Sequence, residues 1–228
     1  MNEKQQHDAA ADLLIKEVDE DLRHEQLTNL WKRHGVLVVG FGVAAVLAVA
    51  GWQGWRAWDG QQRKDSSLRF HEIASLLEQG KRDQAVDDLT RLAADGSGGY
   101  RLLANLRLAE LRQQQGDLAA AAAIYRAVAA DSSVASVYRD MALIRAGYLT
   151  LDSSDPAQLE KAMEPLAVES SSWRHSAREI QALAALRRGD KARAADLFGR
   201  LSEDAAAPEG MRTRAAEMLA VTGQADRG

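Results

Sequence analysis

The chain has no cysteine and only 3 prolines among its 228 residues. The lack of cysteine excludes disulfides, thiolate metal sites and cysteine nucleophiles, and it fits any cellular compartment. Scarce proline, with few β-branched runs outside residues 36–49, favours an all-α chain. The net charge of −4 gives no basic excess of the kind that nucleic-acid binding requires. The length suits one ordinary domain, or a small domain with an appendage.

Catalytic motifs are also missing from the sequence. None of the 5 histidines lies in an HExxH pattern, and neither a G-x-S-x-G elbow nor a phosphate-binding glycine loop occurs. His71 beside Glu72 is typical of a surface pair, and His175 of a residue at a helix start. We therefore expect no enzyme, no cofactor, no metal and no small-molecule substrate.

One long apolar run is present, "RHGVLVVGFGVAAVLAVAGWQGWRAW" at Arg33–Trp58. Residues 34–55 contain no Asp, Glu, Lys or Arg. As a helix they reach about 33 Å, enough to cross a hydrocarbon core of about 30 Å. Four of the 5 tryptophans flank the run, as in the aromatic belts of membrane helices. These are Trp31, Trp52, Trp55 and Trp58. A buried core helix gives no reason for that placement.

A removable signal sequence is the main alternative, because residues 48–50 resemble an A-x-A cleavage site. However, the residues before the run are numerous and acidic, whereas a signal n-region is short and basic. We therefore predict an uncleaved membrane-spanning helix over residues 34–58. Charge leaves its orientation open, because equal numbers of Lys and Arg lie close to it on either side.

Small residues form a row along the predicted span. They are Gly40, Ala44, Ala48 and Gly51. Such a row allows close approach of a second membrane helix and is a candidate docking face, although small residues are also common in spans. Ahead of the span, residues 8–33 predict a short amphipathic helix with an acidic face, which packs on a partner or is a solvated tail.

After a polar linker at residues 59–67, similar segments recur. Three align without gaps, "GKRDQAVDDLTRLAAD", "GDLAAAAAIYRAVAAD" and "GDKARAADLFGRLSED", and "SDPAQLEKAMEPLAVE" fits loosely. Their spacing is that of a helix-pair solenoid. We expect first helices near residues 68–79, 100–115, 135–150 and 173–188, each followed by one of these segments as the second helix. A final helix after residue 207 is expected to cap the solenoid.

The aligned segments share a glycine at the turn, an alanine five residues later and a large apolar residue four further on. The sets are Gly80, Gly116 and Gly189; Ala85, Ala121 and Ala194; and Leu89, Tyr125 and Phe198. Glycine tolerates the positive φ of a tight turn, and the alanine lets the paired helices approach. Asp117 and Asp190 are expected to cap second helices. In the third helix pair, Pro165 is expected to end the second helix early.

The register of these residues resembles the tetratricopeptide repeat. With "DEDLRHEQLTNLWKRHG" and a span ending in "GWQGWRAW", the whole arrangement resembles the ancillary SecYEG translocon subunit family of bacterial inner-membrane proteins. The resemblance implies a cytoplasmic tail at residues 1–33, a single span at 34–58 and a periplasmic tetratricopeptide-like solenoid at 68–228. It also implies as partners the Sec translocon, a membrane-anchored periplasmic prolyl isomerase and exported chains, which the protein assists as a chaperone-like adaptor.

First helices line the concave face of such solenoids, and aromatic and arginine side chains are favoured at recognition surfaces. The candidate protein-binding groove is therefore Tyr100, Arg107, Tyr138, Arg145, Trp173 and Arg178. The alternative is packing between repeats for the aromatics and solvation for the arginines. Two other functions fit the same architecture: a periplasmic scaffold for cell-envelope or division machinery, and a membrane-tethered receptor that faces the cytosol.

Overall fold

The computed structural model describes the backbone of residues 3–224 and the side chains of residues 32–222 apart from Val38. Over this described range all of the regular structure is helical, as the composition predicts. The chain forms two compact units, Met1–Gly60 and Gln61–Gly228.

The first unit consists of most of helix α1 (Glu3–Glu78). The described large apolar side chains between Val36 and Val49 are exposed, from 54% at Val39 to 88% at Val36. α1 is the one helix among the described residues that is long and apolar enough to cross a membrane. The amphipathic face predicted for residues 8–33 lies outside the described side chains.

The polar linker predicted at residues 59–67 is helical, because α1 continues without a break to Glu78. Of these residues only Gly60 strongly disfavours a helix, by about 1 kcal/mol relative to alanine. Side-chain hydrogen bonds also connect residues one turn apart in this segment. Gln61 Nε2 donates to Asp65 Oδ1 at 3.0 Å, and Ser66 Oγ donates to the Gln62 carbonyl at 2.8 Å.

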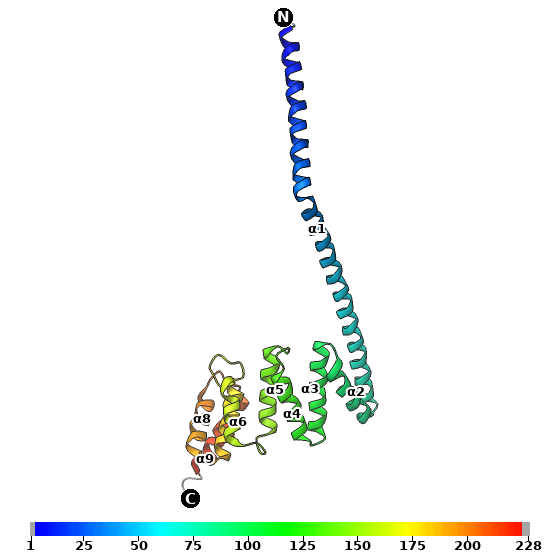
Figure 1. Ribbon diagram of the computed structural model, residues 1–228. Helices are drawn as coiled ribbons and strands as arrows, with labels where there is room; N and C mark the ends of the chain where they lie inside the picture. Colours follow the sequence, from blue (N-terminus) through cyan, green and yellow to red (C-terminus); the bar gives the residue numbers. More distant parts are fainter. Residues whose placement is uncertain (1–2, 225–228) are drawn as a thin grey trace. The chain divides into compact units, whose positions relative to one another are not determined.

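The second unit begins with residues 61–78 of α1 and continues as a row of helix pairs (Figure 1). The helices are α2 (Arg82–Asp95), α3 (Gly98–Gln114), α4 (Leu118–Ala130), α5 (Ser136–Leu149), α6 (Pro156–Met163), α7 (Arg174–Arg187), α8 (Lys191–Glu203) and α9 (Glu209–Gln224). The end of α1, α3, α5 and α7 are the first helices of the pairs, and α2, α4, α6 and α8 are the second helices. This confirms the tetratricopeptide-like solenoid.

Local rules account for the turns. Gly80, Gly116 and Gly189 have φ values of 75°, 81° and 84°, in the left-handed region that favours glycine. Asp117 Oδ1 accepts the Ala120 N–H at 3.0 Å, and Asp190 Oδ1 accepts the Arg193 N–H at 3.1 Å. Both predicted caps are therefore confirmed.

The third pair is shorter, as Pro165 predicts. α6 begins after Asp155, whose Oδ1 accepts the Gln158 N–H at 2.9 Å, and it ends at Met163. A 3₁₀ turn, η1 (Glu164–Leu166), then includes Pro165. Proline lacks an N–H and its ring clashes with the preceding turn, so the α-helix cannot continue through it.

The core follows the row of helices. Ala85, Ala121 and Ala194 are fully buried where paired helices meet, and Leu89 and Phe198 are at most 1% exposed beside them. At the end of the row, Met211 and Ala215 of α9 pack in the same cluster as Phe198. α9 therefore covers the last apolar face, which is the capping role expected from the sequence.

Candidate functional site

A groove runs along the first helices of the second unit. It consists of four hollows: one between α1 and α3 (about 500 Å³), one between α3 and α5 (about 650 Å³), one between α5 and α7 (about 340 Å³), and one between α7 and α9 (about 330 Å³). Neighbouring hollows share lining residues. Phe70 and Arg107 line the first two, Gln113, Met141 and Arg145 line the second and third, and Tyr148 lines the last two. We call this row of adjoining hollows the first-helix groove.

The α3/α5 hollow has the greatest volume of the four, and much of its lining is apolar. Phe70, Leu103, Leu106 and Met141 contribute apolar side chains, and Tyr125 reaches it from α4. Leu103 is 44% exposed, so apolar surface is open to a partner here. Such a surface suits a protein segment that inserts apolar side chains between α3 and α5.

Three of the six candidate groove residues line the hollows. Arg107 lines the α1/α3 and α3/α5 hollows, Arg145 lines the α3/α5 and α5/α7 hollows, and Trp173 lines the α5/α7 hollow. Trp173 is also half-buried against a core cluster, so its ring both packs and contributes to the wall.

The other three candidates lie outside the four hollows. The Tyr100 ring packs on Phe70, with 6.1 Å between the ring centroids. Arg178 donates from Nε to the Ala167 carbonyl at 3.0 Å and pairs with Glu169, so it fixes the loop before α7. Tyr138 is 47% exposed in the first turn of α5. The contacts of Tyr100 and Arg178 hold neighbouring elements of the solenoid together, so these two residues fit the alternative of a structural role and not a binding role.

The groove also contains residues that the sequence reasoning missed. On α3 these include Leu103, Leu106, Glu110 and Gln113, and on α5 they include Met141, Ile144 and Tyr148. Leu103, Glu110, Met141 and Tyr148 lie three or four residues from Arg107 or Arg145, which is the separation of neighbours on one helix face. That spacing is the signal that identifies these four, whereas it does not identify Leu106 and Ile144, which are adjacent to the arginines in sequence.

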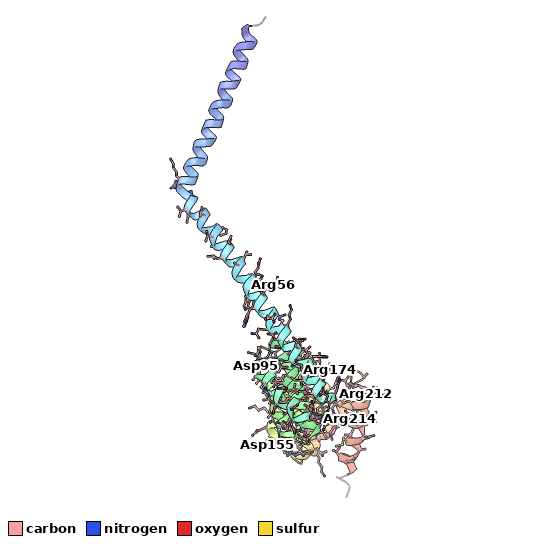
Figure 2. The ribbon with its side chains drawn as sticks, turned by 90° about the vertical axis from the view of Figure 1, so that its right-hand side faces the viewer. Arg56, Asp95, Asp155, Arg174, Arg212 and Arg214 are labelled. Atoms are coloured by element: carbon pink, nitrogen blue, oxygen red, sulfur yellow. The ribbon has the colours of Figure 1, made fainter. Side chains whose placement is uncertain are left out.

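A polar network closes the far end of the groove. The Tyr148 hydroxyl donates to Glu179 Oε2 at 2.5 Å, and Arg214 of α9, labelled in Figure 2, pairs with Glu179 Oε1 at 3.0 Å. Glu179 is 6% exposed. Burial, with the hydrogen bond to the Glu179 carboxylate, raises the pKa of Tyr148 far above its ordinary value. Tyr148 is therefore a neutral hydrogen-bond donor at physiological pH.

The arginines of the groove differ in their partners. Arg107 pairs with Glu110 at 2.5 Å, and Arg214 pairs with Glu179. Arg145 is exposed and makes no hydrogen bond or ion pair with any side chain that the structure describes. Its charge acts on the nearby Tyr125 hydroxyl, whose pKa burial raises and Arg145 lowers. The middle of the groove therefore carries one uncompensated positive charge.

The candidate membrane-docking row lies on α1 in the first unit. Gly40, Ala44, Ala48 and Gly51 are all exposed, and a Cβ added at Gly40 or Gly51 meets no atom within 4 Å. Further along α1, the Arg56 guanidinium, labelled in Figure 2, lies 5.7 Å from the centroid of the Trp52 ring. The row of small residues is therefore accessible to a second helix. The contact between Arg56 and Trp52 has the geometry of a cation–π interaction.

Comparison with known proteins places the fold. The sequence pattern of the tetratricopeptide repeat-like domain matches residues 28–217. The matched range begins before the apolar run of α1 and ends in α9, so it includes that run as well as the helix pairs. No curated protein matches the chain. Since the match covers most of the sequence, the chain belongs to the tetratricopeptide repeat-like domain family.

Proposed function

We propose that this protein is a membrane-anchored adaptor that binds segments of partner proteins in the first-helix groove. The row of adjoining hollows from α1 to α9 carries this proposal. Domains of this family are typically protein-binding scaffolds, and stacked helix pairs create extended concave surfaces for that purpose. Apolar hollows between charged and aromatic side chains match the composition of recognition surfaces.

The exposed apolar side chains of α1 support the membrane anchor. Among the described side chains from Val36 to Val49, eight large aliphatic or aromatic residues are exposed. Each Val, Leu or Phe at the centre of a membrane helix favours insertion by about 0.3–0.6 kcal/mol, so together they favour a membrane-spanning position. Trp52, Trp55 and Trp58 are 57–61% exposed directly after them, where an interfacial aromatic belt belongs. Anchoring raises the effective concentration of the groove for partners at the same membrane.

The finer assignment rests on the resemblance of the tail, span and repeats to the ancillary SecYEG translocon subunits. We infer a bacterial inner-membrane protein with its N-terminus in the cytoplasm and its repeats in the periplasm. There the groove holds exported chains, next to the Sec translocon and a membrane-anchored prolyl isomerase. The contacts are chaperone-like and of low affinity.

The groove is tested by two leucines of equal exposure. Leu103 lies in the α3/α5 hollow and Leu118 lies at the start of α4, outside the four hollows, and each is 44% exposed. We expect Leu103→Asp to reduce co-isolation of exported chains from solubilised membranes, because it places a charge in the apolar hollow. Leu118→Asp is expected to behave as wild type. Equal recovery with both variants would contradict groove binding.

The location is tested separately by labelling with a membrane-impermeant maleimide, which the absence of native cysteine makes specific. In spheroplasts, Ser132→Cys is expected to label while Ala10→Cys labels only after permeabilisation. The reverse pattern would place the repeats in the cytosol and favour the tethered-receptor alternative. Translocon subunits among the co-isolated proteins would distinguish the proposed function from a scaffold for envelope or division machinery.

A further inference from the structure

Arg145 lies at the junction of two hollows of the first-helix groove. It lines both the α3/α5 hollow and the α5/α7 hollow, together with Gln113 and Met141. A segment that runs along the groove from α3 to α7 therefore passes this side chain. The rest of the lining includes Leu106 in the α3/α5 hollow and Trp173 in the α5/α7 hollow, and the charged side chains beside them, Arg107 and Glu110, are paired with each other.

The charges around Arg145 leave it without compensation. Glu110, the acidic residue of the α3/α5 hollow, is bound to Arg107 at 2.5 Å. Glu179, in the α7/α9 hollow, is bound to Tyr148 and Arg214. Tyr125 and Tyr148 are neutral at physiological pH, because burial is the largest cause of a raised pKa in each. Neither hydroxyl therefore supplies a negative charge to the guanidinium.

An occupant of the groove removes water from Arg145. If the occupant is wholly apolar, the guanidinium loses solvation and gains nothing in return. If the occupant places a carboxylate there, the two groups form a charge-assisted hydrogen bond. The flanking apolar walls favour large apolar side chains on both sides of that carboxylate.

We propose that Arg145 makes the groove selective for protein segments in which an aspartate or glutamate lies between large apolar residues. The apolar side chains enter the hollows on either side, and the carboxylate binds the Arg145 guanidinium. This selectivity rests on the proposed function of the groove as a protein-binding site. Arg145 acts as a specificity-determining residue, because it discriminates between segments that fit the hollows equally well.

The experiment uses three synthetic twelve-residue peptides that share leucine-rich flanks and differ only in a central Glu, Gln or Lys. Dissociation constants are measured by fluorescence anisotropy with the full chain in lipid nanodiscs. We expect the Glu peptide to bind about fivefold more tightly than the Gln peptide, the effect of one partly exposed ion pair. The Lys peptide is expected to bind most weakly.

Variants of the arginine provide the decisive comparison. Arg145→Gln is expected to abolish the difference between the Glu and Gln peptides, and Arg145→Glu to reverse the preference towards Lys. Arg126→Gln is the matched control, since Arg126 is an exposed arginine outside the four hollows, and it is expected to keep the wild-type ratio. Circular dichroism confirms that each variant is folded.

The outcomes separate the two proposals. If all three peptides bind wild type equally and Leu103→Asp weakens them all, the groove binds segments but the charge selectivity is wrong. If the Glu preference survives in Arg145→Gln, another group provides it and the assignment to Arg145 is overturned. If no peptide binds at millimolar concentration, the groove is not a binding site and both proposals fail.

Discussion

Replacing Tyr148 by phenylalanine tests the polar network at the far end of the groove. The Tyr148 hydroxyl donates at 2.5 Å to Glu179, a carboxylate that is 6% exposed. A hydrogen bond to a charged group contributes about 1.5–3 kcal/mol to stability, so Tyr148→Phe is expected to lower the free energy of unfolding by that amount. Urea unfolding followed by circular dichroism measures the change. Tyr138→Phe, at an exposed position, is the control and is expected to change it by less than about 0.5 kcal/mol.

A double-mutant cycle identifies the source of that stabilisation. In a Glu179→Gln background the partner of Tyr148 is neutral, so Tyr148→Phe is expected to cost only about 1 kcal/mol. The Arg214 side chain is 58% exposed, so its pair with Glu179 contributes no more than about 1 kcal/mol. If Tyr148→Phe costs the same in both backgrounds, the hydrogen bond to the carboxylate is not the cause.

The same residue predicts a dependence on alkaline pH. Burial and the Glu179 hydrogen bond raise the pKa of Tyr148 in the folded state above the unfolded value of about 10. Its stabilisation is therefore fully present below about pH 10 and is lost as the pH rises further. Tyr148→Phe is expected to flatten the stability curve in that window. An unchanged alkaline limb would refute the reasoning.

Three further predictions concern the fold. Phe198 of α8, which is 1% exposed, packs in a cluster with residues of α7 and α9, and Phe198→Ala is expected to cost about 3–5 kcal/mol in urea unfolding; a loss below 1 kcal/mol would contradict the core described above. Gly116 has a φ of 81°, so Gly116→Ala is expected to cost about 1–2 kcal/mol, whereas Gly98→Ala, in open space at the start of α3, is expected to be tolerated. The hydrogen bond from the Arg193 N–H lowers the pKa of Asp190 in the folded state. The ionised Asp190 carboxylate therefore stabilises the fold above about pH 4, and this stabilisation is lost as the pH falls through the folded pKa. Asp190→Asn keeps a helix-capping side chain but removes the charge, so it is expected to reduce the loss of stability at acid pH. If the loss of stability at acid pH is unaltered, it arises from other carboxylates.

Local rules predicted much of the fold. The turn glycines, the capping aspartates and the effect of Pro165 depend on neighbours within a few residues, so the sequence alone sufficed. Polar composition alone did not reveal that the linker at residues 59–67 is helical, although polar residues such as Gln61 and Arg63 are good helix formers.

The candidate groove was predictable only in part, because the exposure of a helix face depends on its tertiary neighbours. Tyr100 and Arg107 lie seven residues apart on α3 and share a face, yet Phe70 of α1 packs on Tyr100 while Arg107 lines two hollows. The Glu179–Arg214 pair joins residues 35 positions apart, about one repeat, but the repeat spacing alone does not indicate which side chains of successive units meet. Such contacts depend on how the helix pairs stack.

The central claim, that partner segments lie in the first-helix groove, is tested most directly by photo-crosslinking in living cells. A photoreactive phenylalanine analogue is placed at Leu103, inside the α3/α5 hollow, or at Leu118, outside the four hollows with the same 44% exposure. The proposed function predicts crosslinks to exported chains from position 103 that are absent or much weaker from position 118. Equal crosslinking from both positions, or crosslinks from 118 alone, would contradict it.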